Sequence, residues 1–175
     1  MATNSKQQGN MPNAHLHELF TEELKDILGA ERQLLKGLKK MANAAGNAKL
    51  KEAFETHYQQ TEGQIERLKT VFSGLGMAAR GKKCKAMEGL LEEADEIIED
   101  FQDSPEVLNA ALISAAQKVE HYEIASYGCL ATYAKLMGHA EAQELLGATL
   151  AEEKETDELL TLIAMEEANT EGASK

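Results

Sequence analysis

Residues 20–45 read FTEELKDILGAERQLLKGLKKMANAA, and this stretch decides the fold. Its apolar residues recur every three or four positions, a spacing that places them on one face of an α-helix. At the middle of that face stands a carboxylate, Glu31, where the pattern predicts a leucine. We therefore expect an amphipathic helix over residues 17–45 that points an acid into its own core.

Three further stretches repeat the pattern and predict long helices over residues 48–73, 105–137 and 140–166. Each carries ligand-type residues at apolar positions of its stripe. Removing one ion from water costs several kcal/mol even after relaxation, while a whole domain is stable by only about 5–15 kcal/mol. Buried acids in this number need a cation as their partner. The candidate metal ligands are Glu31, His57, Glu120, Glu123, Glu153 and Asp157.

The connections between these helices predict the topology. Tight links at Gly46 and Gly138 indicate two antiparallel hairpins, and a crossover of about 30 residues joins them. The crossover is long enough to travel the length of a bundle, and residues 87–101 within it predict a shorter helix. The expected fold class is therefore all-α: a ferritin-like antiparallel four-helix bundle with one long crossover containing a short fifth helix.

A weak internal repeat places the candidate ligands at matching heights. Residues equally far from a hairpin turn lie at the same level, because the rise per residue is constant. The residues 15 positions from Gly46 or Gly138 are Glu31, Thr61, Glu123 and Glu153, and they should share one layer. A second layer, one turn or about 5–6 Å away, should contain His57, Glu120 and Asp157. Two layers at this spacing can hold a metal pair about 3.5–4 Å apart.

The ligand pattern is close to that of di-iron carboxylate bundles. Such bundles use one Glu from each of two helices and a Glu-x-x-His from each of the other two. Glu31 and Glu123 fill the single positions, but the paired positions read TEGQ at 61–64 and EKET at 153–156. The alternative is a core histidine and acids that pair with a lysine or a tyrosine hydroxyl. The absence of Lys and Arg from the four stripes favours a metal site.

The composition of the chain restricts the kinds of partner and the cellular compartment that we expect. The net charge of −12 disfavours nucleic acid and anionic membranes. No run approaches the roughly 18 apolar residues of a membrane span, the start lacks an apolar signal segment, and the two cysteines form no CxxC pair. We expect a cytoplasmic protein with a disordered N-terminal arm over residues 1–15, the bundle over 16–166 and a flexible tail over 167–175.

Residues 115–128, AAQKVEHYEIASYG, resemble the YciE/YciF family of ferritin-like bacterial stress proteins, and residues 84–90, CKAMEGL, resemble the crossover motif of that family. The resemblance implies a homodimer, a rubrerythrin-like dinuclear metal site and a link to stress responses. Rubrerythrin carries a separate iron module held by four cysteines, and this chain has two. Any redox turnover would therefore need an external electron donor.

The leading hypothesis is a protein with two metal ions per chain, iron or manganese, that reacts with peroxide or dioxygen. An oxygen-rich ligand set suits these metals better than copper. Glu123, with Glu31 or Glu153, would bridge the ions, and the remaining candidates would be terminal ligands. We expect Tyr127 and Gln60 to support the ligands by hydrogen bonds. The alternatives are a non-enzymatic stress protein whose metal is structural or absent, and an iron-storage protein.

Overall fold

The chain is all-helical over residues 14–169, the part that this computed structural model describes. The expected all-α class is therefore confirmed. The predicted arm, 1–15, and the predicted tail, 167–175, lie outside the described residues except for 14–15 and 167–169, which are helical. The elements are α1 (Ala14–Ala44), α2 (Ala48–Gly74), α3 (Lys85–Phe101), α4 (Pro105–Leu136), α5 (Ala140–Ile163) and a closing π-helical turn, η2 (Ala164–Ala168).

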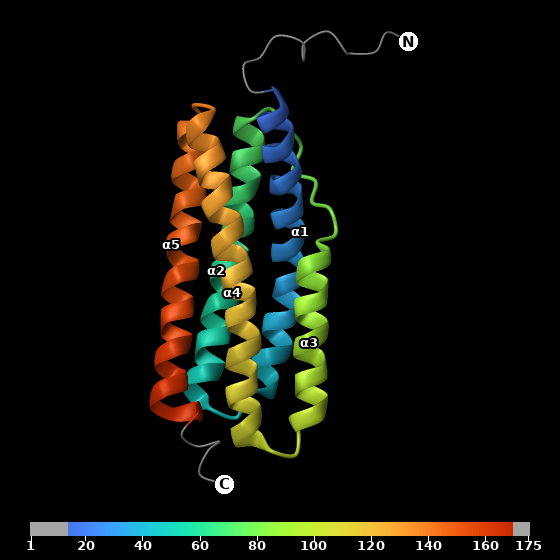
Figure 1. Cartoon of the computed structure of the whole chain (residues 1–175), viewed down its shortest axis with the longest axis vertical. Helices are drawn as coiled ribbons and strands as arrows, with labels where there is room; N and C mark the ends of the chain where they lie inside the picture. The colour runs from blue at the N-terminus through green and yellow to red at the C-terminus, as the bar shows by residue number, and fades with distance from the viewer. Residues whose placement is uncertain (1–13, 170–175) are drawn as a thin grey trace.

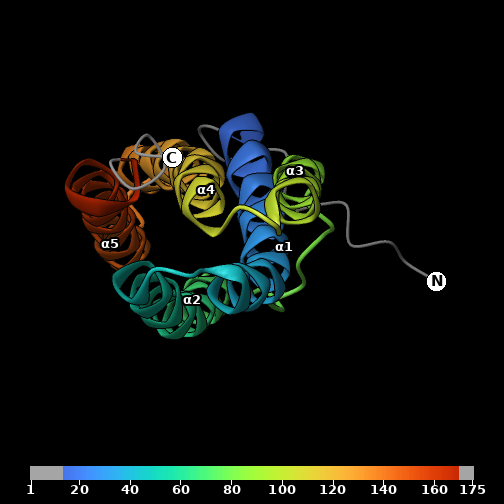
Figure 2. The ribbon, with the colours of Figure 1, turned by 90° about the horizontal axis from the view of Figure 1, so that it is seen from below.

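The four long helices run side by side (Figure 1). Viewed along their length they form a ring in the order α1, α2, α5 and α4, with each helix in contact with the next (Figure 2). Helix α3 lies outside this ring, against α1 and α4. None of the described helices is long and apolar enough to cross a membrane.

The hairpin turns end their helices in two different ways. Gly138 follows α4 with φ of +75°, the left-handed conformation in which glycine commonly terminates a helix. Gly46 was expected to end α1 similarly, but it lies outside the positive-φ region. Instead the backbone N–H groups of Gly46 and Asn47 donate to Oδ1 of Asn109 on α4, at 2.9 and 3.1 Å. A long-range side chain thus holds the backbone of this turn, whereas a local glycine closes the other.

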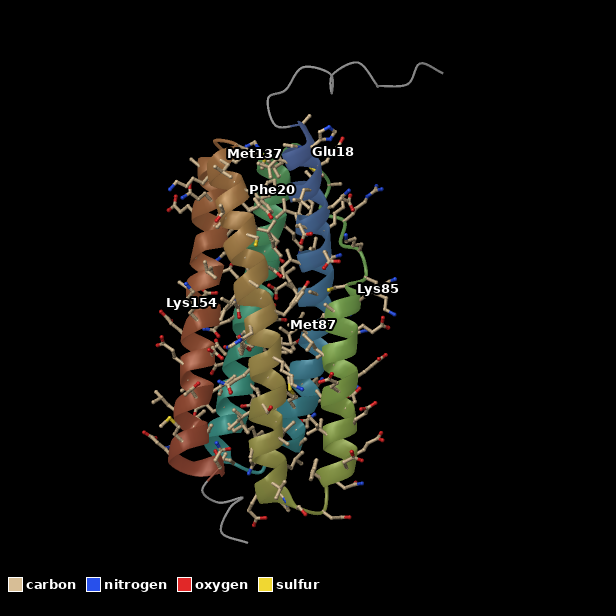
Figure 3. The ribbon with its side chains drawn as sticks, viewed as in Figure 1. Glu18, Phe20, Lys85, Met87, Met137 and Lys154 are labelled. Carbon is tan, nitrogen blue, oxygen red and sulfur yellow. The ribbon has the colours of Figure 1, made fainter. Side chains whose placement is uncertain are left out.

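The crossover is fixed to α1 at its middle. Gln33 accepts from the backbone N–H of Cys84 at 2.8 Å and donates to the carbonyl of the same residue at 3.0 Å. A Cβ atom at Gly29 would lie 1.6 Å from the carbonyl oxygen of Lys82, so only glycine fits there. Met87, at the start of α3, is fully buried between α3 and its neighbours (Figure 3). Helix α3 therefore packs on α1 and α4 of its own chain.

Candidate metal centre

A set of ligand-type side chains interrupts the apolar core near mid-height of the ring. All are at most 2% exposed, and every long helix contributes at least one. Glu120 and Glu123 lie on the same face of α4, because side chains three positions apart are neighbours on a helix. The set consists of Glu31 from α1, His57 from α2, Glu120 and Glu123 from α4, and Glu153 from α5.

The ligand atoms of this set lie close together. Nε2 of His57 is 3.2 Å from Oε1 of Glu120 and 3.7 Å from Oε2 of Glu153. One ligand atom from each of these three residues and from Glu123 lies within 4.8 Å of the others. Since metal–oxygen and metal–nitrogen bonds are about 2 Å long, donors on opposite sides of one ion are about 4 Å apart. The arrangement therefore has the size that a cation requires.

The buried side chains leave many polar atoms without a hydrogen-bond partner. A buried polar group without a partner costs about 1–3 kcal/mol, more if charged, so native cores avoid such groups. Here they belong to neighbouring side chains, four of which each offer one atom to a common site, and a bound cation would satisfy the atoms that face it. Carboxylate oxygens with one imidazole suit iron or manganese, so the residues fit the expected metals. The atoms are Glu31 Oε2, both ring nitrogens of His57, Gln64 Oε1, Glu120 Oε2, both Glu123 oxygens and Glu153 Oε2.

Burial and mutual repulsion shift the pKa values of these groups. Burial raises the pKa of Glu31 to about 7, although hydrogen bonding from Tyr127 opposes the shift. Burial and the nearby carboxylates raise the pKa of Glu123 and of Glu153 well above the ordinary range. Burial alone would lower the pKa of His57, but Glu120 and Glu31 outweigh it and raise that pKa. Without a cation the cluster must therefore hold protons.

Two residues outside the cluster support it. The hydroxyl of buried Tyr127 donates a hydrogen bond to Oε1 of Glu31 and so links the neighbouring helices α4 and α1. Burial and the charge of Glu31 raise the pKa of Tyr127, so this hydroxyl stays a donor. Gln60 lies beside His57 and contributes to its raised pKa. The structure thus places both expected supporting residues next to ligand-type side chains.

Two threonines, Thr61 and Thr156, stand at positions where the Glu-x-x-His pattern has a metal ligand, and each is hydrogen-bonded within its own helix. Thr61 directs its hydroxyl to the carbonyl of His57 at 2.9 Å, within its own helix. Thr156 does the same with the carbonyl of Glu152 at 3.1 Å. Each threonine hydroxyl therefore donates its proton within its own helix and not to the cluster.

Asp157 is not brought into the cluster. Its side chain is 22% exposed, accepts a hydrogen bond from Gln117 at 3.2 Å and lies 3.4 Å from Nε2 of His121. Four residues after Glu153 correspond to 400° of helical rotation, or 40° beyond one full turn. That rotation carries Asp157 to the α4 side of α5 and toward the surface.

Sequence reasoning missed a polar connection on the α2 side of the cluster. Gln64 donates its amide hydrogens to Glu153 and, at 3.1 Å, to Glu152. Arg67 in turn binds both carboxylate oxygens of Glu152. Gln64 and Arg67 are three residues apart on α2 and therefore lie on the same face of the helix. This spacing was the signal in the sequence that could have predicted the connection.

Two sequence comparisons with known proteins give close similarities. The family described as "Domain of unknown function (DUF892)" matches residues 15–173. Protein YciF from Escherichia coli (strain K12) is 48% identical over 161 residues, covering 91% of this chain and 96% of that protein.

Solved structures agree. The crystal structure of the E. coli stress protein YciF matches with a TM-score of 0.82 and 50% identity, covering 86% of this chain and 94% of that one. YcfI from Rhodopseudomonas palustris, described as a candidate structural protein, matches with a TM-score of 0.82 and 38% identity, covering 91% and 98% of the two chains.

Proposed function

This chain belongs to the DUF892 family, and we propose that it serves as a ferritin-like dinuclear metal protein of the bacterial stress response. The link to stress rests on the similarity to YciF, which is described as a stress protein of E. coli. To this link we add a chemical role. In that role the protein holds two ions of iron or manganese between α1, α2, α4 and α5 and reacts with peroxide or dioxygen.

One observation carries the proposal: the four acids and one histidine of the cluster, together with the adjacent Gln64, have eight buried polar atoms without hydrogen-bond partners. A folded domain could not retain this many ionised acids in its core without a compensating cation. In the proposed centre Glu123, with Glu31 or Glu153, would be shared by the two ions, and His57 and Glu120 would complete the set of residues that hold them.

Bound iron or manganese would supply the redox chemistry toward peroxide or dioxygen. The residues of the chain hold and shield the reacting site. Tyr127 keeps Glu31 oriented, Gln64 keeps Glu153 oriented, and the surrounding apolar side chains of the ring exclude bulk water. With two cysteines in total, the chain lacks a four-cysteine iron module, so electrons would come from an external donor.

A non-enzymatic role is the second candidate, and the description of the relative YcfI favours it. In that case the cation would stabilise the bundle without turnover. The protein would then act through its assembly and not through catalysis.

We propose a homodimer for both candidate functions. An exposed apolar strip on the last turns of α5 and η2 offers a surface for self-association; it consists of Leu159, Leu162 and Met165. Light scattering at micromolar concentration tests this expectation, and a monomer would contradict it.

Metal analysis tests the main proposal. The full chain, purified without a histidine tag, should bind about two iron or manganese ions, and a chelator should remove them. Peroxide consumption with an added reductant then separates the enzyme from the structural protein. A chain that binds no cation before or after loading would overturn the metal centre.

A further inference from the structure

A continuous polar path leads from the surface to the buried cluster between α2 and α5. Its outer end is Arg67, 30% exposed, which binds Glu152, 25% exposed, through both carboxylate oxygens. Its inner end is Glu153, fully buried within the cluster. Gln64 joins the two, because its amide nitrogen donates to Glu152 at 3.1 Å and also to Glu153.

Glu152 differs from the other partly exposed acid beside the cluster. Asp157 is similarly exposed, but its partners are Gln117 and His121 on the outer side of α4. Glu152 instead shares a hydrogen-bond donor with a member of the cluster. The shared donor, Gln64, is fully buried and has its Oε1 atom unpartnered, so an oxygen that can bind a cation also stands on the path. Lys154, the next residue after Glu153, is exposed and lies on the outside of α5 (Figure 3).

We infer that Glu152 is the docking carboxylate through which a divalent cation reaches the cluster, and that Arg67 is the cationic latch that occupies Glu152 until the cation arrives. The inference rests on the proposed function, because it concerns how the same centre is loaded. It assigns roles to two residues that the proposed ligand set does not include.

Charge and mobility explain how the latch would work. A divalent cation needs carboxylate oxygens along its route, since an uncompensated ion in an apolar core is prohibitively costly. Arg67 can leave Glu152 because its guanidinium group is 30% exposed, so water can replace the carboxylate as its hydrogen-bond partner while the cation takes the carboxylate. Glu152 then holds the cation beside Gln64, whose amide nitrogen binds Glu153 of the cluster and whose buried Oε1 atom has no partner. Thr149, which accepts from Arg67 at 3.2 Å, keeps the guanidinium group close enough to close the latch again.

The rate at which the metal-free full-length protein takes up Mn²⁺ tests the inference, and loss of the signal of free Mn²⁺ in electron paramagnetic resonance measures it. Glu152→Gln should slow uptake by about tenfold or more, because a charge that steers ions changes association rates by this amount. Arg67→Gln should speed uptake severalfold by opening the latch. Both variants should bind as much Mn²⁺ at equilibrium as the parent protein. The matched control Asp157→Asn should load at the parental rate.

Opposite signs for the two variants are the decisive result, since a purely structural ion pair would give both variants the same defect. Should Glu152→Gln lower the melting temperature, Glu152→Asp keeps the charge and should load near the parental rate. Equal rates for Glu152→Gln and the parent would overturn the docking role while leaving the metal centre intact. A lower final Mn²⁺ content in Glu152→Gln would make Glu152 a ligand instead. If the parent protein takes up no Mn²⁺, the metal centre fails and the path fails with it.

Discussion

Tyr127 and Glu31 are 96 residues apart in the chain and are joined by a hydrogen bond in the core. The tyrosine hydroxyl donates to Oε1 of the carboxylate and leaves Oε2 without a partner. The bond therefore ties α4 to α1 and at the same time turns one oxygen of Glu31 toward the cluster.

Tyr127→Phe should weaken metal binding without removing it. The substitution leaves Oε1 of Glu31 unpaired, so the free energy of unfolding of the metal-free protein should fall by about 1–3 kcal/mol. Loss of a hydrogen bond to a ligand typically lowers metal affinity by about 10–100-fold. Chelator competition measures the affinity and urea unfolding measures the stability. Tyr133→Phe, on the partly exposed side of the same helix, should change neither; unchanged affinity in Tyr127→Phe would contradict the supporting role.

The metal-free protein should be less stable at about pH 8 than at about pH 5.5. Glu31 has a folded pKa of about 7 against an ordinary value of 4.5, so between these values the folded state binds more protons than the unfolded state. Stability then falls as the pH rises through that window. The pKa values of Glu123 and His57 are also raised and act in the same direction.

Bound cations would compensate the ionised acids, so chelation should lower the melting temperature more at about pH 8 than at about pH 5.5. Calorimetry of the loaded and metal-free protein at both pH values provides the measurement. Equal effects at the two pH values would speak against a buried metal centre.

Glu123→Ala should abolish binding of the paired metals at little cost in stability. Leu130→Ala, two turns along the same buried face, should instead cost about 2–5 kcal/mol by opening a cavity and keep its metal. Glu62→Ala is the matched acidic control, since Glu62 is exposed on α2. Metal content per chain and urea unfolding distinguish the three variants. Two ions per chain in Glu123→Ala would refute the bridging role.

Gly29→Ala should destabilise the fold because the added Cβ would lie 1.6 Å from the carbonyl oxygen of Lys82, a backbone atom. The crossover would have to move, at a cost of about 3 kcal/mol or more. Gly63→Ala is the opposite case, since no atom lies within 4 Å of its added Cβ. That substitution should gain roughly 0.5–1 kcal/mol by favouring the helix. Urea unfolding of both variants checks the contrast, which similar stabilities would contradict.

The helices and most of the cluster could be predicted from the sequence because both follow from periodicity. An acid that occupies an apolar position of the helical pattern is predicted to be buried. Glu31 and Thr61 are each 15 residues from Gly46 in the sequence, so both are predicted at the same height along the bundle. Helix ends were predictable where a local signal sets them, as at Pro105 and Gly138.

Features that depend on tertiary contacts could not be predicted. Cys84 caps α3 by accepting from Met87 at 3.4 Å, a role in which serine, threonine, aspartate and asparagine are the usual residues. The Asn109 cap on α1 joins residues far apart in the chain. The bidentate pair of Arg67 and Glu152 depends on how α2 and α5 are rotated against each other, which periodicity fixes only to within tens of degrees. The same uncertainty in rotation accounts for Asp157.

The cluster draws Glu31 and His57 from the α1–α2 hairpin and its other three acids from the α4–α5 hairpin. Neither hairpin could hold the proposed pair of ions alone. Bound metal would therefore link the two hairpins, which could otherwise unfold locally and independently of each other. Amide hydrogen exchange would then slow in both hairpins together as the centre fills. In the metal-free protein each hairpin would follow its own local opening. The ions would thereby convert two neighbouring cooperative units into one.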